Sequence, residues 1–63
     1  MKISAIIPAF NEEPRIGNVL DVVKEMELIE EIIVVDDGST DNTYKVAIKK
    51  GVKVIRLDSN KGK

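Results

Sequence analysis

The stretch from Ile32 to Thr43 constrains the fold of this chain more than any other. Four consecutive aliphatic residues end in two carboxylates, a glycine and a run of small hydroxyl and amide residues. An apolar run of this kind is typical of a strand buried on both faces, as the strands of parallel sheets are. Asp36 and Asp37 then stand at the carboxyl end of that strand, where open α/β sheets bind their ligands.

A first strand and a first helix are predicted before this stretch. Residues 2–8 form a short apolar run that ends at Pro8, and Asn11 is a favourable cap for a helix that begins after it. The apolar residues that follow are spaced by three and four positions, which predicts one stripe facing a core. The members of this stripe are Ile16, Val19, Leu20, Val23 and Met26.

A second helix is predicted after the strand at residues 31–36. Ser39 or Thr40 can cap this helix, which we expect to continue to about Lys50. Gly51 then supplies the left-handed residue that ends it. The residues expected on the inner side of the helix are Tyr44, Ala47 and Ile48.

A third strand is predicted at Val52–Leu57, before a loop over residues 58–63. This order of elements predicts an α/β fold over residues 1–63, a three-stranded parallel β-α-β-α-β unit of the Rossmann-like kind. Both helices would lie on one face of the sheet, whereas parallel sheets are usually covered on both faces. We therefore expect either the opening part of a longer, truncated domain, which we favour, or self-association through the uncovered sheet face.

The composition excludes several classes of function. The 63 residues contain no cysteine and no histidine, so disulfides, thiolate metal sites and the commonest general base are absent. Ten basic residues balance eleven acidic ones, and aromatic residues are 3% of the chain, so no nucleic-acid-binding surface is indicated. No apolar run approaches the roughly 20 residues of a membrane span. We expect a cytoplasmic protein, with any membrane association supplied by missing parts of a parent protein.

The carboxyl ends of the first two strands are expected to lie side by side. One strand leads into Pro8 to Glu12 and the other into Asp36 to Ser39. Together these segments would form a crevice with carboxylates, two helix N-termini and one aromatic ring, and helix N-termini attract phosphate. This set of groups favours a nucleotide as ligand, although the second segment alone is also typical of a simple turn.

These two segments also carry a family resemblance. The sequence IIPAFNE at residues 6–12, followed by VVDDGSTD at residues 34–41, resembles the start of the family 2 glycosyltransferases. The tail, VIRL at residues 54–57 and NKGK at residues 60–63, resembles their next block. The resemblance covers nearly the whole chain. It implies the opening part of a glycosyltransferase A-type fold, which binds a nucleotide sugar through UDP or GDP.

The resemblance implies nucleotide-binding roles for Pro8, Ala9, Phe10, Glu12, Asp36, Asp37 and Lys61. Asp37 is expected to contact the base. Asp36 is a weaker candidate for direct contact, because alternation along a strand points neighbouring side chains apart. Lys61 would lie near the pyrophosphate if the tail folds over the site.

Family members also carry a later D-x-D motif that binds Mg²⁺ or Mn²⁺, and a later acid that serves as general base. Neither is found in this chain, so we predict no catalytic or metal-binding residue in it and expect the metal ligands downstream in a parent enzyme. That enzyme would transfer a sugar from a UDP- or GDP-sugar to the hydroxyl of an unidentified acceptor, for which a lipid-linked molecule is one candidate. The chain alone would be inactive, because it lacks the base and the metal ligands. The alternative is a non-catalytic nucleotide-binding or self-associating α/β module.

Overall fold

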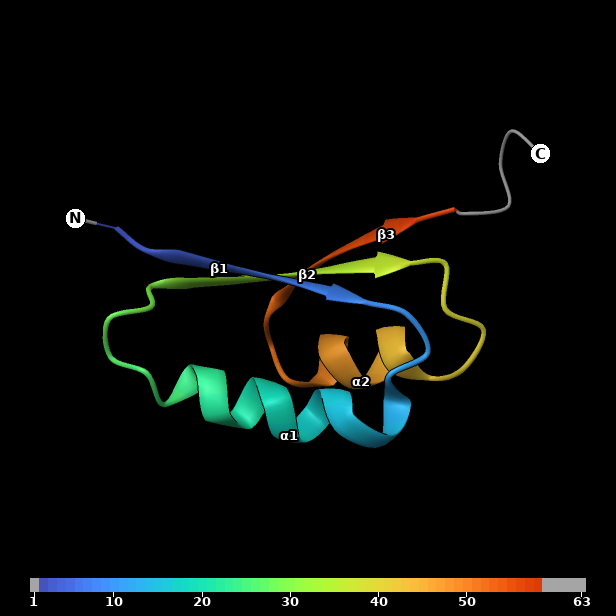
Figure 1. The fold of residues 1–63 in the computed structure, drawn as a ribbon, viewed down its shortest axis with the longest axis horizontal. Coiled ribbons are helices and arrows are strands. Elements are labelled where there is room, and N and C mark those ends of the chain that lie inside the picture. The colour runs from blue at the N-terminus through green and yellow to red at the C-terminus, as the bar shows by residue number, and fades with distance from the viewer. Residues whose placement is uncertain (1, 59–63) are drawn as a thin grey trace.

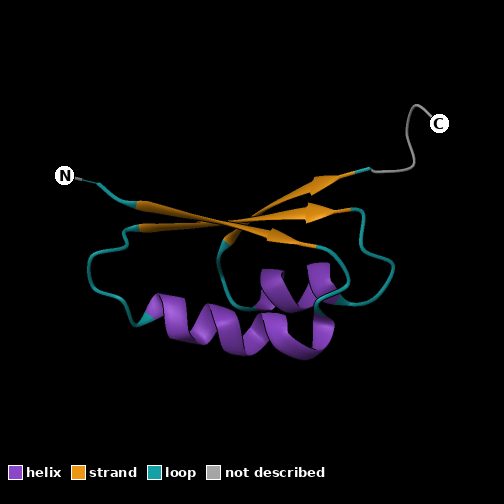
Figure 2. Cartoon of the chain, viewed as in Figure 1, coloured by secondary structure: helices purple, strands orange, loops and turns teal. Residues whose placement is uncertain are grey.

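The computed structural model describes residues 2–58. Its elements, in chain order, are β1 (Ser4–Ala9), α1 (Glu13–Lys24), β2 (Glu31–Asp37), α2 (Thr43–Lys49) and β3 (Lys53–Leu57). The strands form a parallel sheet in the order β1-β2-β3, and both helices lie against the same face of it (Figure 1). The two layers are plain in Figure 2, where the three strands lie above both helices. The predicted β-α-β-α-β unit is therefore confirmed.

The core lies between the sheet and the helices. It consists of Ala9 from β1, Val34 from β2, Ile16 and Leu20 from α1, and Ala47 from α2. None of these residues is more than 4% exposed. Because strand side chains alternate between faces, the helix-facing positions of β1 and β2 supply the sheet's share of this core.

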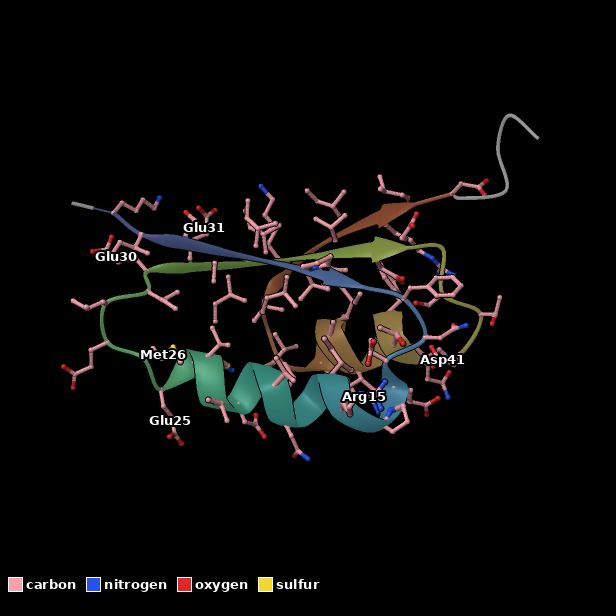
Figure 3. The ribbon with its side chains drawn as sticks, viewed as in Figure 1. Arg15, Glu25, Met26, Glu30, Glu31 and Asp41 are labelled. Atoms are coloured by element: carbon pink, nitrogen blue, oxygen red, sulfur yellow. The ribbon has the colours of Figure 1, made fainter. Side chains whose placement is uncertain are left out.

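The buried stripe of α1 is narrower than the sequence predicts. Ile16 and Leu20 are buried, but Val19 is 42% exposed and Met26 is 48% exposed. Met26 lies beyond the last helical residue, Lys24, near the end of the molecule opposite to Asp41 (Figure 3). Its assignment to a helical stripe was wrong because the helix stops first. In the described part of the chain, neither helix has the length and hydropathy needed to cross a membrane.

The prediction for α2 was right at Ala47 and wrong at Ile48, which is 47% exposed. The helix begins at Thr43, later than predicted, so neither Ser39 nor Thr40 is its cap. Its end was predicted correctly, because Gly51 has a φ of 80°, in the left-handed region where a side chain would be strained.

β1 continues through Pro8 to Ala9, so the prediction that Pro8 ends this strand was wrong. In the described sheet, β1 pairs only with β2 and therefore lies at an edge. A proline is tolerated in an edge strand, since the amide hydrogen that it lacks is not required for pairing on the open side.

No described element covers the face of the sheet opposite the helices (Figure 1). Strand alternation places apolar side chains on this face. Ile6 of β1 is 64% exposed, and Ile55 and Leu57 of β3 are 42% and 46% exposed. The bare face expected from the sequence is therefore present in residues 2–58.

Candidate functional site

The carboxyl ends of β1 and β2 lie side by side, as predicted. Ala9 of β1 is the register partner of Asp36 of β2, so the loops that follow both strands begin at the same edge of the sheet (Figure 1). Phe10 directly follows Ala9, and Asp37 directly follows Asp36. Both are exposed, Phe10 to 52%. The structure therefore places an aromatic ring and a carboxylate where a ligand can reach them.

Asn11 connects the two loops and does not cap α1, which corrects the sequence prediction. Its backbone N–H donates to Ser39 Oγ at 2.8 Å, and its side-chain Oδ1 accepts from the backbone N–H of Thr40 at 2.8 Å. Asn11 has a φ of 51°, a left-handed conformation that asparagine tolerates better than most residues. The residue therefore reaches across to the β2–α2 loop instead of back to its own helix.

The first amides of α1 are also occupied by groups of the protein. Glu12 N–H donates to Thr43 Oγ1 at 2.8 Å, and Glu13 N–H donates to Asp41 Oδ2 at 3.2 Å. Pro14 has no amide hydrogen, and the next two amides donate to the Glu12 carbonyl. The expectation that this helix N-terminus would attract phosphate was therefore wrong, because its donors already have acceptors.

Asp41 is the carboxylate that joins the two helix starts. It accepts hydrogen bonds from the Thr43 hydroxyl, from the Thr43 N–H at 2.9 Å and from Glu13 N–H. These hydrogen bonds hold the pKa of Asp41 below its ordinary value, and the bond from the Thr43 hydroxyl has the largest effect. Figure 3 shows Asp41 at the same end of the molecule as Arg15 of α1. Its role in this structure is to organise the loops.

Asp36 is fully buried, with an exposed fraction of 0%. Its Oδ1 accepts from Ser39 N–H at 3.0 Å, and its Oδ2 has no hydrogen-bond partner among the described residues. The Nε of Arg56 lies 3.9 Å from this oxygen. Arg56 also donates from Nη2 to the Ser39 carbonyl at 3.2 Å, and its guanidinium carbon lies 5.0 Å from the centre of the Tyr44 ring.

Sequence reasoning assigned no role to Arg56. The available signal was a basic residue next to the last position of a strand that ends beside the acidic end of β2. The register partner of Arg56 is Asp36, a fact that depends on the pairing of β2 with β3. Local sequence patterns do not specify that register, so this neighbour relation emerges only in the fold.

Two hollows adjoin the loops, and they share no lining residue. The larger, of about 550 Å³, is lined by Gly38, Ser39, Thr40, Asp41, Arg56 and Asp58. The smaller, of about 110 Å³, is lined by Ile7, Pro8, Glu12, Arg15, Ile16 and Val19. The two segments are joined to each other by hydrogen bonds, such as those of Asn11 with Ser39 and Thr40. The two predicted segments therefore border separate hollows.

The predicted nucleotide-binding residues divide into exposed and buried ones. Pro8, Phe10 and Asp37 are exposed, and Glu12 is partly exposed. Pro8 is the register partner of Val35, two residues before Asp37, so Pro8 and Asp37 lie on the same face of the sheet. The carboxylate of Glu12 forms an ion pair with Arg15, with Oε1 and Nη2 2.6 Å apart.

The side chains of Ala9 and Asp36 are 4% and 0% exposed, so in this structure neither can touch a ligand. The physical reason is alternation, which turns both side chains towards the helices. Lys61, the remaining predicted residue, lies outside the described residues.

No metal site is formed by residues 2–58. Among these residues, no three side chains of histidine, cysteine, aspartate or glutamate are arranged to hold an ion. The two exposed loops therefore do not fit a Mg²⁺ or Mn²⁺ centre on their own.

Comparisons with known proteins give a consistent result. The model of the family described as Glycosyl transferase family 2 matches residues 4–63. An uncharacterized protein of Methanocaldococcus jannaschii is 48% identical over 61 residues, which are 97% of this chain and 25% of that protein. The glucosyl-3-phosphoglycerate synthase of Mycolicibacterium smegmatis is 42% identical over 59 residues, 90% of this chain and 20% of the enzyme.

A solved structure is similar to this chain in both fold and sequence. The glucosyl-3-phosphoglycerate synthase of Mycobacterium tuberculosis, in complex with Mn²⁺, UDP and phosphoglyceric acid, has a TM-score of 0.78 and 42% identity. The match covers 87% of this chain and 20% of that enzyme, and another structure of it contains Mg²⁺ and UDP. The chain thus spans a quarter or less of these relatives. Its sequence from residue 4 onward and its fold nevertheless show that it belongs to glycosyl transferase family 2.

Proposed function

We propose that this chain is the donor-nucleotide segment of a longer glycosyltransferase, which transfers a sugar from a UDP-sugar to an acceptor hydroxyl. The observation that carries the proposal is the exposure of Phe10 and Asp37 at adjacent ends of parallel strands, in a family 2 chain. UDP is favoured over GDP because UDP is the nucleotide in the similar synthase structures. A cytoplasmic location is part of the same proposal.

The exposed residues suit distinct parts of a nucleoside. Asp37 stands at the end of β2 and can accept a hydrogen bond from the imide N–H of uracil. Phe10 offers a ring face for stacking on the base. Glu12 can accept hydrogen bonds from the ribose hydroxyls if its ion pair with Arg15 opens. Opening costs little, because a solvent-exposed ion pair contributes only about 0–1 kcal/mol. Glu12 also lines the small hollow beside Pro8.

The remaining parts of the reaction belong elsewhere in the proposed enzyme. Residues 2–58 hold no metal site, so we assign the ligands of Mg²⁺ or Mn²⁺ to other residues of the parent protein. We also place the general base and the acceptor site there, a lipid-linked acceptor being one candidate. The chain by itself is then a binding unit without transferase activity.

The proposal is tested by titrating the folded chain with UDP, UDP-glucose and GDP, with and without Mn²⁺, by calorimetry and by NMR of backbone amides. We expect UDP to shift the signals of residues 9–12 and 37–40. Replacement of Asp37 by alanine should weaken UDP binding by roughly tenfold or more, since a hydrogen bond to a charged group contributes about 1.5–3 kcal/mol. Glu27→Ala is the matched control, because Glu27 is an exposed acid in the segment between α1 and β2.

Two results would count against a UDP site. One is a folded chain in which neither UDP nor UDP-glucose produces binding heat or shifts of the amide signals. If GDP alone produces them, the donor nucleotide is GDP instead of UDP. The other is unchanged UDP affinity in Asp37→Ala, which would remove the proposed base contact.

The uncovered sheet face supports a second proposal, self-association. Ile6, Ile55 and Leu57 expose apolar surface that water solvates poorly, and contiguous patches of this kind commonly mark interaction sites. Sedimentation velocity should then show a dimer or larger species, and Ile55→Lys should shift the chain to monomer. A monodisperse wild-type monomer would refute self-association and would leave the donor-site proposal intact.

A further inference from the structure

Asp36 presents an unusual arrangement for a carboxylate. Its side chain is fully buried, yet its Oδ2 has no hydrogen-bond partner within residues 2–58. A buried charge is tolerated only if nearby groups compensate for its lost hydration. Asp36 forms an ion pair with Arg56, whose Nε lies 3.9 Å from Oδ2. This distance exceeds that of a hydrogen bond, so the attraction between them is electrostatic.

Arg56 contacts three parts of the structure at once. Besides facing Asp36, it donates to the Ser39 carbonyl at 3.2 Å and lies over the Tyr44 ring, with its guanidinium carbon 5.0 Å from the ring centre. Ser39 belongs to the β2–α2 loop and Tyr44 to the first turn of α2. A planar guanidinium suits this position, since it can donate sideways while stacking on an aromatic ring.

The contacts continue from Ser39 into the other loop. Ser39 N–H donates to Asp36, and Ser39 Oγ accepts from Asn11 N–H. One side chain of β3 is thereby connected through Ser39 to both loops of the proposed donor site. Phe10 directly precedes Asn11, and Asp37 directly follows Asp36.

We propose that Arg56 is a positioning residue: paired with the buried Asp36, it holds the β2–α2 loop in the conformation that presents the donor-nucleotide site. In this proposal Arg56 acts through the loop that it holds and not through contact with the base. The loop-positioning part stands on the contacts of the chain alone, while its consequence for nucleotide binding rests on the proposed function.

The experiment compares Arg56→Met, which removes the charge and keeps a flexible stem, with Arg56→Lys, which keeps the charge. Lys53→Met is the matched control, because Lys53 is an exposed cation on the same strand. The first measurement is amide hydrogen exchange in the absence of nucleotide, at Ser39 and Thr40. We expect Arg56→Met to accelerate exchange at these two amides roughly tenfold. This is the effect expected when the loop loses one hydrogen bond from a charged donor, here the bond from Arg56 to the Ser39 carbonyl.

The second measurement is the affinity for UDP. Arg56→Met should weaken binding by a similar factor, Arg56→Lys should recover part of the loss, and Lys53→Met should match the wild type. In an Asp36→Asn background, Arg56→Met should add little, because the partner of the pair is already neutral.

The outcomes separate positioning from general stability. Amide exchange at the core residues Leu20 and Val34 should stay unchanged in Arg56→Met; an equal acceleration in the core would show a merely structural role and overturn the proposal. Unchanged exchange at Ser39 and Thr40 would overturn it as well. If the wild type fails to bind UDP while the loop exchange responds as expected, the proposed function fails and the positioning role stands.

Discussion

Thr43 offers the sharpest test of how the two loops are joined. Its side chain is fully buried, its hydroxyl oxygen accepts the Glu12 N–H at 2.8 Å, and the same hydroxyl donates to Asp41. Replacement by valine keeps the branched shape and removes the hydroxyl. The Glu12 N–H at the start of α1 then loses its acceptor, and Asp41 loses one donor.

The expected loss follows from these contacts. A buried donor left without an acceptor destabilises a protein by about 1–3 kcal/mol, so we expect Thr43→Val to lower the free energy of unfolding by about 2 kcal/mol. For a domain of this size, each 1 kcal/mol corresponds to about 4–8 °C, which gives a decrease in Tm on the order of 10 °C. Thr43→Ser keeps the hydroxyl and loses one methyl group, for which we expect about 1 kcal/mol.

Circular dichroism during heating and during urea titration measures both variants. The expected order of stability is wild type, then Thr43→Ser, then Thr43→Val. Amide exchange at Glu12 should accelerate in the valine variant and stay slower in the serine variant. If valine is tolerated as well as serine, or if the Glu12 amide exchanges equally in both, the hydroxyl does not connect the loops as we argue.

Three further predictions concern stability and are measured by the same unfolding experiments. Gly51→Ala should destabilise the chain by about 1–2 kcal/mol, because Gly51 has a φ of 80°. Gly17→Ala should stabilise it by about 0.5–1 kcal/mol, because a Cβ there meets its nearest atoms at the ordinary contact distances of 3.5 Å and 3.6 Å. Equal effects of the two substitutions would contradict this reasoning. Leu20→Ala should cost about 2–5 kcal/mol, and a loss below 1 kcal/mol would mean that the core is looser than described. The pKa of Asp41 is lowered on folding, so this carboxylate should stabilise the folded chain fully at pH values above its unfolded pKa of about 3.9. That stabilisation should disappear as the pH falls through the lower pKa of the folded state. Asp41→Asn should flatten the dependence of unfolding free energy on acid pH, and an unchanged slope would refute this reasoning.

The order of the elements was predictable because each depends on local sequence. The apolar runs of β1 and β2, the spacing of Ile16 and Leu20, and Gly51 all act within a few residues. The caps were not predictable in this way. Asn11 and Ser39 are both favourable N-cap residues, yet they bond to each other's loops across 28 positions of the chain. Tertiary contacts have here outweighed a local preference of about 1 kcal/mol.

The two neighbouring aspartates show how far a motif can be interpreted from sequence. Strand alternation correctly separates Asp36 from Asp37, but it does not say what the inward carboxylate meets, because its partner comes from a strand 20 residues later. With Arg56 located, the two positions lead to different expectations. A change at Asp37 should lower nucleotide affinity and leave the loop amides protected, whereas a change at Asp36 should first loosen the loop and lower affinity as a consequence. Measuring exchange and affinity on both variants therefore tells whether the acidic end of β2 combines one binding residue with one positioning residue, or two residues of the same kind.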